Sequence, residues 1–190
     1  MKMVCCGAAL LLAVAVGRAD VVSGPKVGDK AEDFTAHGVV GIIDGKDGSY
    51  IKERKGDPTI YVFVSAENFK RPTAQFLKGL DTAMKDAPDK AAVVAVWLAE
   101  KPDMIKEYLP KAQMSLNFVN TSLGVFAGDK SGPKNWGINP DAHVTVVGVK
   151  NGKVTTVSAY ESINGTDVRK VLADFNKVEE KKKKDEPKKK

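Results

Sequence analysis

The chain has 190 residues, 43% of them hydrophobic, which is enough for one hydrophobic core of ordinary size. Its formal net charge of +6 falls to +4 without Lys2 and Arg18, and the stretch 177–190, with eight lysines against four acids, accounts for all of that +4. The body, 20–176, is therefore formally neutral, which argues against a domain that binds a specific nucleic acid through a basic face.

Residues 1–19 have the pattern of a signal peptide. Lys2 gives a positive start, the apolar run 4–16 is too short to anchor the chain across a bilayer, and small residues precede Asp20. A buried N-terminal helix is the alternative, but the run has no polar face. We therefore expect an exported protein, periplasmic or extracellular, with no transmembrane segment once the signal is cleaved.

The two cysteines, Cys5 and Cys6, both lie inside this predicted signal. They precede the apolar core, whereas a lipidated cysteine should follow it, so a lipid anchor is disfavoured. Cleavage would leave a mature chain with no disulfide, no thiolate nucleophile and no cysteine metal ligand.

An irregular segment, 20–57, follows. Glycines at 41, 45 and 48 predict a hairpin or turn before Tyr50 and Ile51. The acidic loop 44–48 suggests calcium, but it lacks the ligand spacing and the closing glutamate of a helix-loop-helix calcium loop, so we interpret it as a plain turn.

The stretch 59–84 predicts a strand, a turn and a helix around which the chain is organised. Residues 60–64 are apolar and rich in β-branched and aromatic types, as in a strand buried on both faces. Pro72 suits the first turn of a helix. The apolar residues of that helix recur at helical spacing and predict one buried face: Phe76, Leu77, Leu80, Ala83 and Met84.

Two further strands and a helix are predicted next. A second buried strand covers 91–98, and a helix opens at Pro102. Leu116–Val119 is interpreted as a short third strand, and the Gly- and Pro-rich stretch 120–142 as a long connection with one helical turn near Asn135 and Trp136. Trp136 is expected to close the edge of the core. The inner face of the helix is predicted to hold Met104, Ile105, Tyr108 and Leu109.

The remaining segments predict a hairpin, a helix and a tail. Asn151-Gly152 separates the β-branched runs 143–149 and 153–159, which is a strong hairpin signal. A helix starting at Thr166 presents Val168, Val171, Leu172 and Phe175 on one face. The Lys-rich stretch 177–190 is predicted to be disordered, either as a solvating tail or in weak contact with anionic surfaces.

This order of elements resembles the thioredoxin-like fold. The implied architecture is α/β and three-layered, with a central mixed sheet of about five strands, a C-terminal β-hairpin and a helix, in a single domain over 20–176. The stretch 27–34, VGDKAEDF, resembles the opening motif of the redoxin and alkyl hydroperoxide reductase–thiol-specific antioxidant branch, with Glu32 where that motif has proline.

The resemblance implies redox thiols in the turn after the first long strand. An ungapped comparison of 60–72 places Phe69 and Pro72 at the positions of the Cys-x-x-C pair, and neither can form a thiolate. Arg71 could correspond to the arginine that assists a peroxidatic cysteine, but it has no thiol to activate. Ala142 holds the position of the family's cis-proline, with Pro140 two residues early.

Other chemistry receives little support from the sequence. Ser65 would need His143 as a base, with Asp141 or Glu67 to orient it, and their spacing is not diagnostic. The two histidines, His37 and His143, are too far apart in sequence to indicate a metal site. We therefore expect no catalytic, cofactor-binding or metal-binding residues.

The sequence favours an exported, cysteine-less thioredoxin-like domain that acts as a non-catalytic binding or structural module of the cell envelope. Its partner would be a protein or peptide at the degenerate active-site groove, where Phe69 either faces outward or folds into the core. One alternative is a thiol-disulfide or peroxide-related oxidoreductase by descent, with a lost or non-standard site. Another is a protein whose Lys-rich tail is the functional part.

Overall fold

The computed structural model describes residues 21–87 and 90–185. The predicted signal peptide, with both cysteines, lies outside these ranges. Within them, no helix is long and apolar enough to cross a membrane.

The centre of the fold is one mixed sheet with strand order β2-β1-β5-β4-β3-β6-β7. It has seven strands, so the predicted count of about five is wrong. The two additional strands form in the segment that precedes the first predicted strand, where β1 pairs with β5 and extends the sheet. The strands are β1 (Ala36–Val40), β2 (Asp47–Gly48), β3 (Thr59–Ser65), β4 (Ala92–Ala99), β5 (Thr121–Ala127), β6 (Val144–Lys150) and β7 (Lys153–Tyr160).

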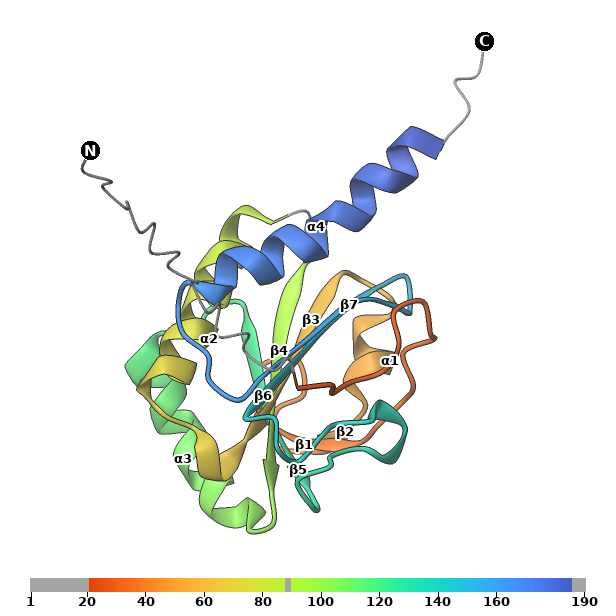
Figure 1. The fold of residues 1–190 in the computed structure, drawn as a ribbon. Helices are drawn as coiled ribbons and strands as arrows, with labels where there is room; N and C mark the ends of the chain where they lie inside the picture. The colour runs from red at the N-terminus through yellow and green to blue at the C-terminus, as the bar shows by residue number, and fades with distance from the viewer. Residues whose placement is uncertain (1–20, 88–89, 186–190) are drawn as a thin grey trace, which may run out of the picture.

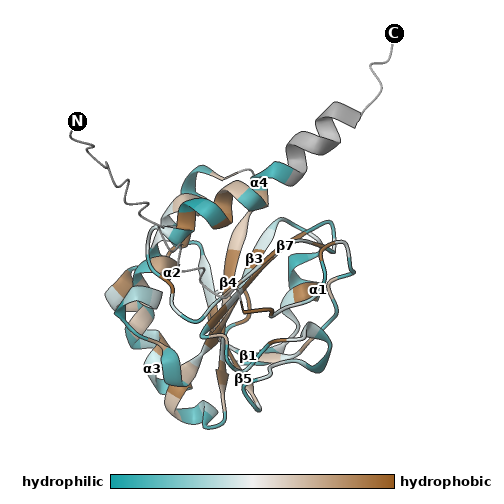
Figure 2. Cartoon of the chain, in the orientation of Figure 1, coloured by the Kyte–Doolittle hydropathy of each residue, from teal (hydrophilic) through white to brown (hydrophobic). Residues whose placement is uncertain are grey.

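Strand β3 is buried along its whole length, as its composition predicted. It runs parallel to β4 and antiparallel to β6. Because successive side chains of a strand point to opposite faces, Ile60, Val62 and Val64 enter one core cluster, whereas Tyr61 and Phe63 enter another. The sheet therefore separates two hydrophobic cores, and Figure 2 shows hydrophobic residues running along its central strands.

Three helices cover one face of the sheet: α2 (Arg71–Ala83), α3 (Pro102–Leu116) and α4 (Asp167–Asp185). The chain steps from β3 to β4 to β5 in one direction, so right-handed crossovers place α2 and α3 on the same side (Figure 1). The short helix α1 (Tyr50–Arg54) lies on the other face, with Trp136 from the 3-10 turn η3 (Lys134–Trp136). Burial raises the pKa of the phenols of Tyr50 and Tyr61 in this second core.

The predicted third strand, Leu116–Val119, is wrong. Helix α3 continues to Leu116, where Asn117 adopts a left-handed conformation with φ of 49° and ends it. The strand begins at Thr121 instead, so the first part of the expected long connection is β5. The phase of α3 also differs from the prediction, since Leu109 and Ala112 are buried while Met104 and Tyr108 are exposed.

The C-terminal hairpin and helix are confirmed. Asn151 and Gly152 both have positive φ, as a two-residue hairpin turn requires. Val168, Val171 and Phe175 are buried against the sheet. Helix α4 extends past Asn176 to Asp185, and the disorder expected over 177–190 stays a prediction.

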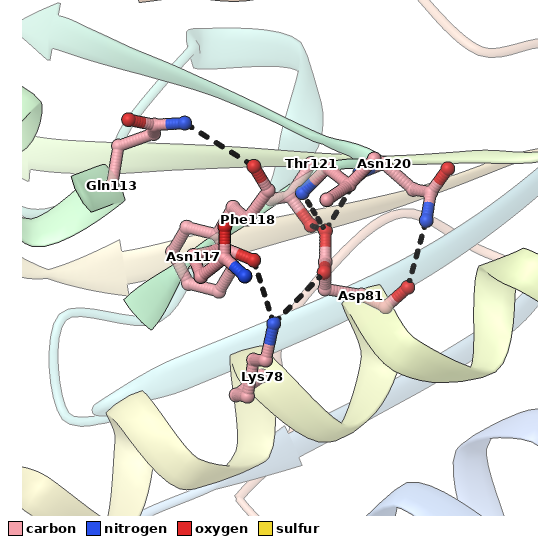
Figure 3. Close-up of polar contacts among 8 residues, drawn as sticks. Lys78, Asp81, Gln113, Asn117, Phe118, Asn120 and Thr121 are labelled. Carbon is pink, nitrogen blue, oxygen red and sulfur yellow. Dashed lines mark hydrogen bonds and ion pairs between the residues drawn. The ribbon is translucent and has the colours of Figure 1, made fainter. Parts of the chain in front are cut away.

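A buried carboxylate joins α2 to the start of β5 (Figure 3). Asp81 is fully buried, and its Oδ1 accepts hydrogen bonds from the backbone amides of Val119 (2.9 Å) and Asn120 (2.8 Å) and from the hydroxyl of Thr121 (2.9 Å). Lys78 Nζ lies 3.4 Å from Asp81 Oδ2. This cluster ties α2 to the residues at which β5 begins.

Candidate binding site

The turn between β3 and α2 is the place where the sequence comparison expects redox thiols. It consists of the 3-10 turn η1 (Ala66–Asn68) and Phe69 and Lys70, which lead into α2. The turn is held against the start of β6, because Ser65 N donates a hydrogen bond to His143 O over 3.0 Å. Pro72 is exposed in the first turn of α2, where its missing N–H costs no helical hydrogen bond.

The side chain of Phe69 is half-buried. It therefore lies between the two orientations expected from the sequence, one facing outward and one folded into the core. Its ring contacts Trp97 of β4 edge-on, with centroids 5.3 Å apart, and Tyr108 of α3, with centroids 6.1 Å apart. The remaining part of the ring lines an open groove between α2 and α3. Phe69 is therefore neither a free surface anchor nor a fully internal residue.

This groove, which we call the Phe69 groove, has a volume of about 440 Å³. One face of α3 forms a wall of it, since Tyr108, Ala112 and Ser115 recur at helical spacing. Helix α2 contributes Ala74 and Arg71 to the opposite wall. This face of α3 was not predicted, because the sequence pattern places Tyr108 in the interior. The helical repeat of polar and apolar residues from Tyr108 to Ser115 was the available signal.

A second hollow, the strand-end pocket, lies at the carboxyl ends of β3 and β4 and has a volume of about 300 Å³. Ser65, Glu67, Met104 and Lys130 are among its lining residues. Lys130 Nζ lies 2.6 Å from Glu67 Oε2, and this hydrogen bond, with the charge of Glu67, raises the pKa of Lys130. Lys130 and Glu67 are thus paired with each other in this pocket, which Glu100 and Lys101 also line.

The residues considered for hydrolytic chemistry are brought to the same end of the sheet but do not contact one another as a catalytic set. Ser65 Oγ accepts a hydrogen bond from Asn68 Nδ2 (3.1 Å), and Glu67 pairs with Lys130. In the described part of the chain, no side-chain hydrogen bond joins Ser65 to His143. A serine nucleophile needs a base in such contact, so the geometry gives no support to a hydrolase.

The two histidines make their contacts on different strands of the sheet. His37 Nδ1 lies 2.8 Å from Asp47 Oδ1, across the pair of strands β1 and β2. His143 directly precedes β6, where its carbonyl accepts a hydrogen bond from Ser65 N and its amide donates one to Tyr160 O. Across 21–87 and 90–185, no group of three or more His, Cys, Asp or Glu residues could hold a metal ion.

The backbone at Ala142, the position of the cis-proline in the thioredoxin-like resemblance, differs from that expectation. Ala142 is buried shortly before β6, and its amide donates a hydrogen bond to Asn139 O over 3.0 Å. Pro140 lies in the turn that precedes it. In the described ranges every peptide bond is trans, so the backbone beside the turn lacks the cis bond that the resemblance implies.

The parallel β3-α2-β4-α3-β5 unit, followed by an antiparallel hairpin and a final helix, is a thioredoxin-like fold. No family model matches the sequence, and no curated protein matches it. Solved structures do match, and they include a thioredoxin and a 1-Cys peroxiredoxin.

Three of these structures illustrate the likeness. Peroxidoxin BcpB from Mycobacterium tuberculosis is 15% identical with a TM-score of 0.58, covering 81% of this chain and 98% of its own. The exposed lipoprotein thioredoxin Etrx1 from Streptococcus pneumoniae is 19% identical with a TM-score of 0.52, covering 75% and 98%. A DsbF homologue from Corynebacterium diphtheriae is 12% identical with a TM-score of 0.55, covering 84% and 94%. Identities this low establish the fold alone.

Proposed function

We propose that this protein is an exported, non-catalytic binding module that holds a segment of another protein in the Phe69 groove. The observation that carries the proposal is the half-buried ring of Phe69, which forms part of an open groove. The ungapped sequence comparison aligns Phe69 with the first cysteine of the Cys-x-x-C pair. An aromatic ring at that position replaces a reactive group with a contact surface.

The composition of the chain supports the absence of thiol chemistry. From residue 7 to the end the sequence contains no cysteine, and the second thiol position is Pro72. Thiol-disulfide exchange and peroxide reduction both begin with attack by a thiolate. The oxidoreductase alternative would therefore need a thiol from an uncleaved leader or from a partner.

Export is supported by the signal-like pattern of residues 1–19. The pneumococcal neighbour is an exposed lipoprotein, so the fold occurs outside the cytoplasm in at least that protein. Weak contact of the Lys-rich tail with anionic surfaces is a compatible second activity, because its net charge would attract such surfaces at low salt.

The first test uses the 20–190 protein in insulin-reduction and hydroperoxide-consumption assays, with a thioredoxin and a peroxiredoxin as positive controls. We expect rates equal to those without protein, because no thiolate is present. Turnover above that background would overturn the non-catalytic proposal.

The second test selects peptides that bind the 20–190 protein from a random phage-displayed library. Tyr108 and Met104 are both exposed residues of α3, but Tyr108 lines the Phe69 groove and Met104 lines the strand-end pocket. We expect Tyr108→Ser to weaken the selected peptides about tenfold and the matched Met104→Ser variant to leave them unchanged. Peptides indifferent to Tyr108→Ser would contradict the assignment of the groove.

A further inference from the structure

The Phe69 groove combines an apolar floor with cations on both walls. Phe69, Tyr108 and Leu116 contribute large apolar side chains to its lining. Lys70 and Arg71 line it from the start of α2, and Lys111 lines it from α3. The lining includes no carboxylate, although the domain body as a whole is formally neutral.

Within the part of the chain that the structure describes, no ion pair neutralises these three cations. Lys70, Arg71 and Lys111 are exposed, and none of them belongs to an ion pair within the described ranges. Glu107 precedes Tyr108 on α3 but does not line the groove. The strand-end pocket is different, because there Lys130 is paired with Glu67.

From this charge distribution we infer that the groove binds an acidic peptide segment carrying one large apolar side chain. The inference rests on the proposed function and adds the chemistry of the partner. The apolar side chain would cover Phe69 and Tyr108, and flanking carboxylates would meet Lys70, Arg71 and Lys111. The chain's own tail, 177–190, is excluded as the occupant because eight lysines would face three further cations.

The open form of the groove favours a peptide over a lipid chain. A site for a small apolar molecule usually encloses most of the ligand. Here the groove is a surface hollow between two helices, which suits one anchored side chain within a longer segment.

The test measures binding of three short fluorescent peptides to the 20–190 protein. One has a single phenylalanine flanked by glutamates, the second has the same phenylalanine flanked by serines, and the third has it flanked by lysines. We expect the glutamate peptide to bind at least about tenfold more tightly than the serine peptide at low salt, and to lose that advantage as salt rises.

Charge-reversal variants test whether the tighter binding of the glutamate peptide arises in the Phe69 groove. Lys111→Glu should weaken the glutamate peptide about tenfold. Lys101→Glu makes the same change of charge on an exposed lysine that lines the strand-end pocket, and it should leave binding unchanged. Both variants should unfold at the wild-type temperature, because both lysines are exposed.

The outcomes separate this inference from the function on which it rests. Equal binding of the glutamate and serine peptides, with sensitivity to Tyr108→Ser, overturns the acidic partner and leaves the binding module intact. No binding by any of the three peptides, or equal effects of Lys111→Glu and Lys101→Glu, also overturns the inference. Stronger binding to anionic vesicles than to the glutamate peptide overturns it in favour of a membrane surface.

Discussion

Replacing Asp81 with alanine is expected to lower the free energy of unfolding by about 3–5 kcal/mol. The substitution leaves the amides of Val119 and Asn120 and the hydroxyl of Thr121 without their acceptor. A buried donor such as the Thr121 hydroxyl costs about 1–3 kcal/mol when it loses its partner, and the part-buried amides of Val119 and Asn120 add smaller losses. Chemical denaturation of the 20–190 protein measures the loss.

Two further variants test whether the loss of stability comes from the buried hydrogen bonds of Asp81. Asp86→Ala removes an exposed carboxylate shortly after α2 and should change the unfolding free energy by no more than about 0.5 kcal/mol. Asp81→Asn retains an oxygen acceptor without the charge, so its loss should lie between those of the other two variants. If Asp81→Ala were as stable as Asp86→Ala, the buried cluster would not hold β5 in place.

The second large effect is expected for Trp136→Ala, which should destabilise the protein by about 3–5 kcal/mol. Trp136 is 1% exposed, and its ring centroid lies 5.0 Å from that of Phe63, 5.2 Å from that of Phe34 and 5.6 Å from that of Tyr61. Its Nε1 donates to Glu32 O over 3.0 Å. The indole therefore joins the opening segment to the sheet.

Trp136→Phe separates packing from hydrogen bonding. It keeps an aromatic ring in the second core but removes the donor to Glu32, so we expect a loss of about 1–2 kcal/mol. Urea unfolding, monitored by far-UV circular dichroism, gives the free energy of unfolding of the wild type, Trp136→Ala and Trp136→Phe. A loss below about 1 kcal/mol for Trp136→Ala would show that this face of the sheet does not depend on the indole.

Hydrophobic periodicity was sufficient to predict the central part of the fold. The runs around Val62 and Ala95 are short, apolar and β-branched, and both are buried strands of the sheet. The Asn151-Gly152 pair located the hairpin because its backbone conformation is demanding. These signals are local, so the sequence alone carries them.

The errors arose where tertiary contacts decide the structure. Strand β5 starts at Thr121 because Asp81, about forty residues earlier, binds the residues that precede it. The first two strands are short, and they exist by backbone pairing, since β1 pairs with β5 and β2 pairs with β1. The sequence predicted that a groove lies beside the first helix, but it did not predict the cations that line it. Those cations come from two helices, and the sequence alone does not place these helices side by side.

The central claim is that the mature protein acts without a thiol. It is tested most directly by the intact mass of the protein recovered from its native host, with free-thiol labelling of the same sample. We predict a mass that corresponds to cleavage near Ala19, with no label incorporated. A mass that retains Cys5 and Cys6, with label, lipid or a disulfide on them, would contradict the account and make the N-terminus a redox element or an anchor.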